Sequence, residues 1–297
     1  MAPPIVFDRE LLRARQRRAV KLGAATFLLD AVARDLTDRL SLVLRSFAVA
    51  VDLGTPTDAV RDALQGQVDT LIAADPLAAE RPRQGLAVAA DPEALPFRDA
   101  SLDLVVSGLA LQFVNDLPGT LVQIRRALKP DGLFIAALIG GETLAELRQA
   151  FAAAESEVEG GVSPRVAPFA DLRDLGALLQ RAGFALPVTD FERLTVRYQS
   201  VFALMHDLRH MGAGNALTER RRTPLRRATL LRMAEIYTER FSDPDGRLRA
   251  TFDVLWLSGW APDASQQKPL PPGSARMRLA NALKTEELPA GEKAGRN

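Results

Sequence analysis

The stretch Phe47 to Asp58, FAVAVDLGTPTD, decides the fold. Its apolar run ends in Asp52 and Gly54, which is how a buried parallel strand delivers its carboxyl end to a ligand crevice in an open α/β sheet. A nucleotide-type loop needs further glycines, because backbone amides must approach the ligand without an intervening Cβ. Pro56 and Asp58 stand there instead. The stretch therefore predicts a cofactor-binding protein with an altered cofactor loop.

The composition is that of an ordinary soluble globular protein, with 297 residues, 47% hydrophobic and 25% charged. The 38 basic and 37 acidic residues leave a net charge of +1, so no global field recruits nucleic acid or lipid. An electrostatic partner must be met by a local patch. The absence of cysteine excludes disulfides, thiolate metal sites, iron–sulfur clusters and cysteine nucleophiles.

The apolar runs are far shorter than a bilayer span, so we expect no transmembrane segment. The first residues are basic like a transit peptide, but Asp8 and Glu10 lie among them and no small-residue cleavage site follows. We interpret this stretch as a mature helix and expect a cytoplasmic protein.

Strand and helix patterns alternate at short intervals through the middle of the chain. Apolar residues recur at helical spacing over 8–44, with a break near Gly23. Beyond the first strand, we expect strands at 68–74, 86–90, 104–107, 133–138, 194–198 and 251–260, helices at 58–64, 117–128, 171–182 and from Thr143, and a turn at 129–132. This alternation predicts βαβ units and a mostly parallel sheet.

Three regions follow from these patterns. We expect N-terminal helices over 1–46, an α/β domain over 47–261 and a partly disordered C-terminal extension over 262–297. The segment at about 199–250 is helical in pattern and too long for a bare loop, so we interpret it as an inserted helical cap. Pro, Gln, Lys and Gly accumulate beyond 262, and LPAGEKAGRN predicts a disordered tail.

Each of the first three strands ends in an acid: Asp52, Asp75 and Asp91. In a parallel sheet the three would meet at one edge, where ligands bind. Asp75 follows the glycine turn at the distance from which an acid accepts hydrogen bonds from ribose hydroxyls. Aspartate is also common at strand ends as a turn former or helix cap, which explains any one of them. The three in order favour a nucleoside site.

Three strings carry a family resemblance: DPEALPF (91–97), SLDLVVSGLALQFVNDLP (101–118) and LKPDGLFIAALIGGETLAELRQAF (128–151). The chain resembles class I S-adenosylmethionine-dependent methyltransferases. Within that superfamily it is similar to the methyltransferase-like assembly factors of respiratory complex I, and more distantly to the malonyl-carrier-protein methyltransferase of biotin synthesis. The likeness extends from FDRELLRARQRRA through EGGVSPRVAPFADLRDLGALLQRAGF and FALMHDLRHMG to GWAP.

The resemblance implies a fold, a cofactor and a partner. It implies a seven-stranded, mostly parallel sheet with its last strand antiparallel. It also implies S-adenosylmethionine as cofactor and a protein partner, and through this partner the chain could associate peripherally with a membrane. The cofactor residues that it implies are Asp52, Gly54 and Thr55 on the methionine side, Asp75 and Pro76 at the ribose, Asp91 and Pro92 at the adenine, and Ser107 at the reacting centre. No catalytic acid or base is assigned, because positioning an activated sulfonium supplies most of the acceleration.

Three departures from the family pattern bear on function. The loop reads GTPTD, Gly108 stands where asparagine is usual, and Gln112 with Phe113 replaces a His–Trp pair. Pro56 cannot donate a backbone hydrogen bond, and Asp58 would repel the cofactor's carboxylate unless it is paired. Two main hypotheses stay open: a cofactor-dependent enzyme acting on a protein partner, and a cofactor-free assembly factor. The resemblance adds protein arginine hydroxylation and carrier-protein methylation as further possibilities.

His206 and His210 are the two histidines of the chain and are spaced to share a helix face. That spacing suits two metal ligands, and a carboxylate could complete an iron site. Asp207 follows His206 directly and points elsewhere on a helix. We therefore predict no metal site and interpret the pair as surface or substrate-contacting histidines.

Arginines cluster in two places, the helix that begins near Asp8 and the segment 220–227. Such runs can hold an acidic protein, a phosphopantetheine carrier or RNA, and they are also ordinary solvated helix faces. No aromatic residues are interleaved with them, which disfavours single-stranded nucleic acid. Trp256 and Trp260 share one strand face and are expected in the core.

Overall fold

The computed structural model describes residues 5–80, 85–267, 274 and 277–286. The chain forms two units, 1–262 and 263–297. In the second unit the structure describes one short helix, α9 (Leu279–Leu283). The expected disordered tail at 288–297 lies outside the described residues. All that follows concerns the first unit.

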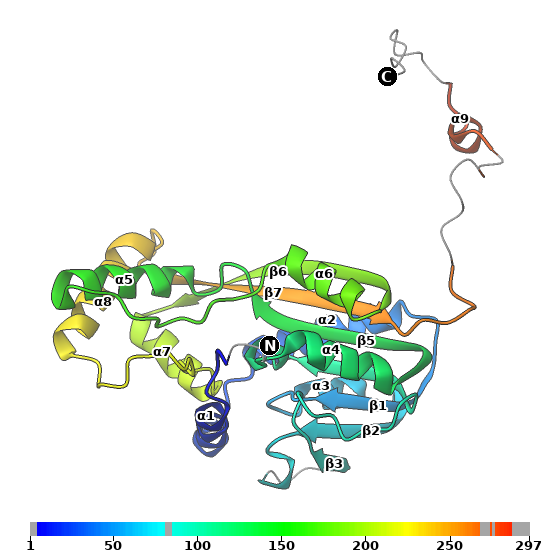
Figure 1. Cartoon of the computed structure of the whole chain (residues 1–297). Helices are drawn as coiled ribbons and strands as arrows, with labels where there is room; N and C mark the ends of the chain where they lie inside the picture. Colours follow the sequence, from blue (N-terminus) through cyan, green and yellow to red (C-terminus); the bar gives the residue numbers. More distant parts are fainter. Residues whose placement is uncertain (1–4, 81–84, 268–273, 275–276, 287–297) are drawn as a thin grey trace. The chain divides into compact units, whose positions relative to one another are not determined.

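A seven-stranded sheet in the order β3-β2-β1-β4-β5-β7-β6 forms the centre of the first unit (Figure 1). The strands are β1 (Phe47–Leu53), β2 (Val68–Asp75), β3 (Leu86–Ala89), β4 (Leu102–Gly108), β5 (Leu128–Gly140), β6 (Ala185–Tyr198) and β7 (Leu248–Trp260). The first five run parallel, and β7 runs antiparallel to both β5 and β6. The predicted sheet with its antiparallel last strand is confirmed.

The helices lie at the positions that the apolar periodicity predicts. They are α1 (Arg9–Leu22), α2 (Phe27–Ser41), α3 (Ala59–Leu64), α4 (Leu117–Ala127), α5 (Ala145–Glu159), α6 (Leu172–Arg181), α7 (Val201–His210) and α8 (Arg227–Phe241). Asp8 caps α1 by accepting a hydrogen bond from the amide of Leu11, and Gly23 follows the helix with φ +88°. The break near Gly23 is thus confirmed. No described helix is long and apolar enough to cross a bilayer.

Two apolar cores, one on each face of the sheet, hold helices α2 to α8. Alternate residues of β5 divide between them: Ile135 faces the core of α2, α5, α7 and α8, whereas Phe134 faces the core of α4 and α6. This alternation is what a parallel strand buried on both faces requires. Trp256 is buried in the first core and Trp260 packs against it, as expected.

Two predicted elements differ from the observed ones. β6 begins at Ala185, nine residues before the predicted strand, because this edge strand pairs only with β7 and its mixed polar sequence lacks an apolar run. The predicted turn at 129–132 lies inside β5, where Asp131 has φ +61° and the register to β4 shifts. A bulge therefore absorbs the turn residues without ending the strand.

Candidate functional site

The carboxyl ends of β1, β2 and β3 meet at one edge of the sheet, as predicted. Asp52 pairs in register with Ala73, and the amide of Gly54 donates to the carbonyl of Ala74 at 2.8 Å. Asp75 ends β2, opposite Ala89 of β3. The sheet thus brings the first two acids together, and Asp91 follows two residues beyond β3.

Asp52 and Thr55 fix the loop after β1 from within. Both are buried, and the hydroxyl of Thr55 hydrogen-bonds the carboxylate of Asp52 and accepts from the amide of Gly108 at 3.0 Å. Gly54 has φ +76°, and a Cβ on it would come within 3.0 Å of the side chain of Ala110. The loop therefore needs glycine at this position both for its backbone conformation and for space.

The two unusual loop residues have different consequences. Asp58 precedes α3 and forms an ion pair with Arg61, so its charge is compensated at the start of that helix. Pro56 lines a large cavity together with Thr57. The repulsion that an unpaired Asp58 would exert on a ligand carboxylate is thus reduced.

Asp75 is buried at the end of β2. One of its carboxylate oxygens accepts a hydrogen bond from the amide of Leu77 at 2.7 Å, which holds the turn after the strand. Asp75 and Pro76 line a small cavity of about 30 Å³ together with Gly54 and Pro92. This cavity lies where the sequence predicts the nucleoside, and α1 covers it with Arg9, Leu12, Arg13 and Gln16.

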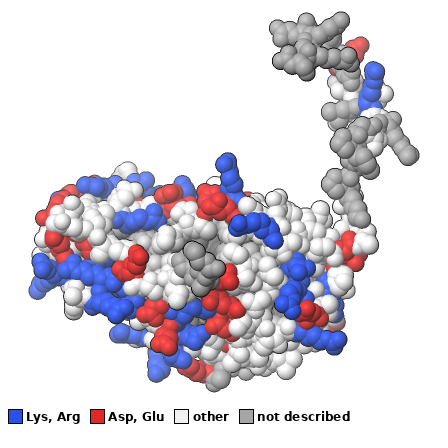
Figure 2. Space-filling model, in the orientation of Figure 1, with Lys and Arg blue, Asp and Glu red and all other residues white. Residues whose placement is uncertain are grey.

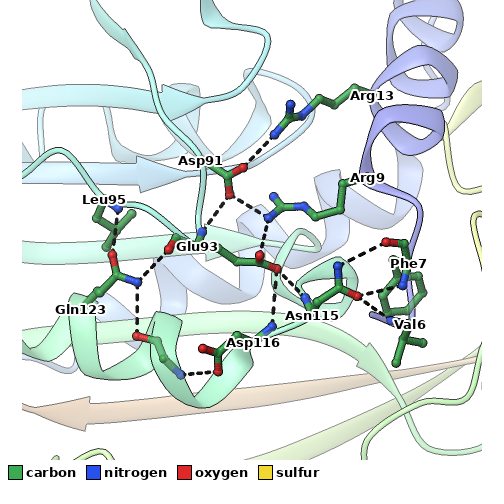
Figure 3. A network of polar contacts seen from close by, with 11 residues as sticks. Val6, Phe7, Arg9, Arg13, Asp91, Glu93, Leu95, Asn115, Asp116 and Gln123 are labelled. Atoms are coloured by element: carbon green, nitrogen blue, oxygen red, sulfur yellow. Dashed lines mark hydrogen bonds and ion pairs between the residues drawn. The ribbon is translucent and has the colours of Figure 1, made fainter. Parts of the chain in front are cut away.

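Asp91 is held by two arginines of α1 (Figure 3). Arg13 lies 2.7 Å from one of its oxygens and Arg9 lies 2.8 Å from the other, while Arg9 also reaches Glu93 at 2.9 Å. Glu93 accepts the amide of Asn115, whose side-chain oxygen accepts the amides of Val6 and Phe7 at 2.9 and 2.8 Å. The network ties the start of α1 to the loops after β3 and β4.

A third arginine of α1 extends this contact. Arg17 forms two hydrogen bonds with Glu80, at 2.6 Å each. Arg9, Arg13 and Arg17 are spaced by four, so they share one helix face. The sequence suggested a partner as one possible role for these arginines, whereas the structure places them on the chain's own acidic edge. Their spacing is the signal that could have identified this face.

The donor set at this edge fits a nucleoside, but the free space does not. Carboxylates at successive strand ends and a close glycine turn suit ribose, adenine and a cofactor backbone. Pockets for ligands of cofactor size measure about 300 Å³ or more, about ten times the 30 Å³ present. With α1 on Asp91, the space at this edge is therefore too small by itself for a ligand of the size of S-adenosylmethionine.

Ser107 and Gly108 end β4 within the protein. The hydroxyl of Ser107 donates to the carbonyl of Leu53 at 2.7 Å, and Ser107 is not among the described residues that line either cavity. Its place at the reacting centre stays a prediction. At Gly108 a Cβ would lie 2.9 Å from Val60 and 3.2 Å from Leu29, so α2 and α3 occupy the space of a side chain there.

A second, larger cavity of about 510 Å³ begins at the cofactor loop. Its lining comes from α1, α2, the start of α5, the loop at 165–169 and the segment 205–225, and it is mostly apolar. Gln112 and Phe113, which replace the usual His–Trp pair, also line it. Phe113 and Gln16 line both cavities, so the two spaces adjoin.

The charged side chains around the large cavity are basic. Arg15, Arg18, Arg165 and Arg209 line it, and of its described lining residues none is Asp or Glu. Arg165 forms an ion pair with Glu155, whose side chain is 1% exposed. Burial, and then the charge of Arg220, lower the pKa of Arg15. The cavity therefore favours an anionic or neutral group over a cation.

The two histidines stack on each other, and His210 lines this cavity. Their ring centroids are 4.1 Å apart, and Nδ1 of His210 lies 2.6 Å from the carbonyl oxygen of Gly23. Burial, and then the charge of Asp207, raise the pKa of the Tyr198 phenol. Among the described residues, no group of three His, Cys, Asp or Glu side chains could hold a metal ion.

Comparisons with known proteins agree with this geometry. A family model described as "Methyltransferase domain" matches residues 51–136. "Arginine-hydroxylase NDUFAF5, mitochondrial" of Danio rerio is 37% identical over 95% of this chain and 91% of that protein. "Malonyl-[acyl-carrier protein] O-methyltransferase" of Laribacter hongkongensis is 36% identical over 90% of this chain and 94% of that protein. The crystal structure of YcgJ of Bacillus subtilis has the same fold, with TM-score 0.52, 14% identity and coverage of 79% and 100%.

Proposed function

Because the chain belongs to the family of the NDUFAF5 arginine hydroxylases, and has their methyltransferase domain, we propose that it is an enzyme that acts on a side chain of a protein partner. We propose further that this partner belongs to respiratory complex I during assembly, as the family resemblance implies. The observation that carries the proposal is the length of the similarity. It covers 95% of the chain, so it includes the inserted helices and α1 as well as the common fold.

We propose S-adenosylmethionine as the ligand of the acidic edge. Asp75 with Pro76 would hold the ribose, Asp91 with Pro92 the adenine, and Asp52, Gly54 and Thr55 the loop on the methionine side. When bound, this cofactor supplies a methyl group on a positively charged sulfur. The ion pair of Asp58 with Arg61 supports this assignment, since it compensates the charge that would repel the cofactor's carboxylate.

The large cavity is the proposed substrate site. It adjoins the cofactor loop through Pro56 and Thr57, and its apolar walls would exclude water from the reacting group. The proposed contribution of the chain is therefore orientation of two ligands in a dry space. No described side chain is assigned as a catalytic acid or base.

The reaction type divides the family. The relatives named arginine hydroxylases favour hydroxylation of an arginine, in which dioxygen gives one oxygen atom to a C–H bond and an external two-electron donor reduces the other oxygen atom to water. The four arginines around the cavity and the lack of acidic residues among its described lining favour a second candidate, methyl transfer to a carboxylate on a carrier protein. A guanidinium substrate would meet like charges there, whereas a carboxylate would find partners. A cofactor-free assembly factor is the third alternative.

The test compares host cells that lack this protein with cells that contain it. Respiratory complex I of both is examined on native gels and by mass spectrometry of the intact subunits. The hydroxylase proposal predicts less assembled complex and one subunit lighter by a single oxygen atom. A loss of one methylene instead supports methyl transfer, and impaired assembly without a mass change supports the cofactor-free factor. Normal assembly with unchanged masses contradicts the proposal. Fractionation of the same cells tests a cytoplasmic location, which we also propose.

A further inference from the structure

A basic pocket of about 390 Å³ lies between the start of α1 and the segment that precedes α8. Its lining consists of Asp8, Leu11, Arg15, Arg220, Arg221 and Arg222. Figure 2 shows Lys and Arg side chains gathered at the end of the molecule that α8 and the preceding loop form. Of the residues that line this pocket, Arg15 also lines the proposed substrate cavity, and none lines the nucleoside edge.

Backbone contacts fix its two walls against each other. The amide of Asp8 donates to the carbonyl of Ala216 at 2.8 Å, and the amide of Thr218 donates to the carbonyl of Val6 at 2.9 Å. Phe7 and Leu217 form a β-bridge between these bonds. The arginines on the two sides therefore face each other because the backbone places them there, unlike arginines on an open helix face.

Two of the four arginines in the pocket are already paired. Arg220 lies 3.0 Å from Asp8 and donates to the carbonyl of Leu217 at 2.7 Å. Arg221 pairs with Glu159, which lies outside the pocket lining. Within the part of the chain that the structure describes, Arg15 and Arg222 have no carboxylate partner. Three guanidinium groups (15, 220 and 222) against the one carboxylate of Asp8 leave two positive charges.

Arg15 carries an unfilled hydrogen-bonding position. Its Nη1 is buried and, among the described residues, has no hydrogen-bond partner. It packs over Gly214, where a Cβ would lie 2.8 Å from this nitrogen. A buried donor without an acceptor is costly, and the nearby charge of Arg220 adds repulsion that also lowers the pKa of Arg15. An anion beside Arg15 would relieve both costs.

Arg15 lines the basic pocket and also the 510 Å³ apolar cavity, so the two spaces adjoin at its guanidinium. We propose that the basic pocket binds the phosphate monoester of a ligand whose apolar chain extends into the large cavity. A phosphate monoester carries nearly two negative charges at neutral pH, which matches the pocket's excess charge. Its oxygens suit the planar fork of guanidinium donors, and an apolar chain gains from burial in the cavity.

Calorimetric titration of the full chain with octyl phosphate, octanol and inorganic phosphate tests the proposal. We expect octyl phosphate to bind at least about tenfold more tightly than either of the others, because it alone fills both spaces. Arg222→Gln should weaken octyl phosphate binding about fivefold to tenfold. Arg226→Gln is the matched control, because Arg226 is an exposed arginine, four residues after Arg222, that does not line the pocket. The affinity of this variant for octyl phosphate should change by less than about twofold.

If octyl phosphate binds no more tightly than octanol, the basic pocket is not a phosphate site. If it binds no more tightly than inorganic phosphate, the apolar chain does not occupy the large cavity. Equal effects of Arg222→Gln and Arg226→Gln would also overturn the assignment, with thermal melting showing that both variants are folded. The proposal rests on the proposed function only in taking the large cavity as the substrate site. Because binding is measured without S-adenosylmethionine, the result stands whether or not that cofactor binds.

Discussion

Two neighbouring spaces at one edge of the sheet differ in almost every physical respect. The nucleoside edge has about 30 Å³, lined by Asp75 and by Pro92, whose neighbours Asp91 and Glu93 pair with arginines of α1. The substrate cavity has about 510 Å³, arginines along its walls and no carboxylate among its described lining. The first is closed by charge pairing and the second is held open by apolar packing.

The comparison shows that residues of α1 line both cavities. One face of α1 covers the acids at the strand ends, and Arg15 and Ala19 line the cavity. An outward movement of α1 that admits a cofactor would therefore also reshape the substrate site. We infer that the two ligands interact through this helix, and the predictions below separate the two spaces.

The largest effect concerns the support of the cavity wall. Glu155→Ala should lower the free energy of unfolding by about 3–5 kcal/mol, because it leaves Arg165 without its partner beside a buried site. Glu155 also accepts the amide of Ser163, so the loop that lines the cavity should loosen. Chemical denaturation measures the change.

Glu157→Ala is the control on the same helix, since Glu157 is half exposed where it meets Arg232, and it should cost less than about 1 kcal/mol. If both variants lose the same stability, the cavity wall does not depend on Glu155.

The second effect concerns the nucleoside edge. Asp75→Ala should weaken S-adenosylmethionine about tenfold to a hundredfold, because ribose hydroxyls lose a buried charged acceptor. Asp58→Ala should change the affinity by less than about threefold, since Asp58 pairs with Arg61. Calorimetry compares the two variants. An unchanged affinity in Asp75→Ala would show that the ribose lies elsewhere.

The third effect is a dependence of stability on pH. Burial raises the pKa of Glu155, but hydrogen bonds from Ser163 and the ion pair with Arg165 outweigh it and leave that pKa below its ordinary value. The same balance, with Arg193 as partner, lowers the pKa of Asp253. Both groups bind a proton more readily when unfolded, so their stabilisation is present above about pH 4.5 and lost as pH falls further.

Thermal melting between about pH 7 and pH 3 measures this loss. Glu155→Gln should flatten the profile below about pH 4.5 relative to the wild type. A variant that follows the wild-type profile throughout would show that Glu155 does not contribute.

The smallest effect concerns the closure by α1. Arg13→Gln should raise the affinity for S-adenosylmethionine about twofold to fivefold, because it removes one contact that holds α1 on Asp91. Lys21→Gln removes a positive charge from an exposed position in the last turn of the same helix, away from both cavities, and should have no effect. Weaker binding in Arg13→Gln would mean that the arginine holds the cofactor itself.

The fold could be predicted because its signals are local. The apolar runs that end in Asp52 and Asp75 mark buried parallel strands, and Gly23 and Gly183 punctuate helices in sequence. β6 was predicted too short, since an edge strand with a solvated side needs no continuous apolar run. The positions of the acids at one edge followed from parallel topology alone.

The two spaces could be predicted only in part. The acids were identified, but their pairing with Arg9 and Arg13 joins residues about 80 positions apart, and no spacing in the sequence reveals it. The charge compensation of Asp58 was a nearer signal, three residues away at Arg61. The large cavity gathers residues from segments spread between Phe7 and Phe252, so its volume depends on packing that the sequence does not display.

The central claim is that the acidic strand ends form a cofactor site beside a separate substrate cavity. Calorimetric titration of the full chain with S-adenosylmethionine tests it most directly. The account predicts saturable binding at one site per chain, tightened by Arg13→Gln and weakened by Asp75→Ala. Absence of binding at millimolar ligand in both the wild type and Arg13→Gln would contradict it and leave the cofactor-free assembly factor.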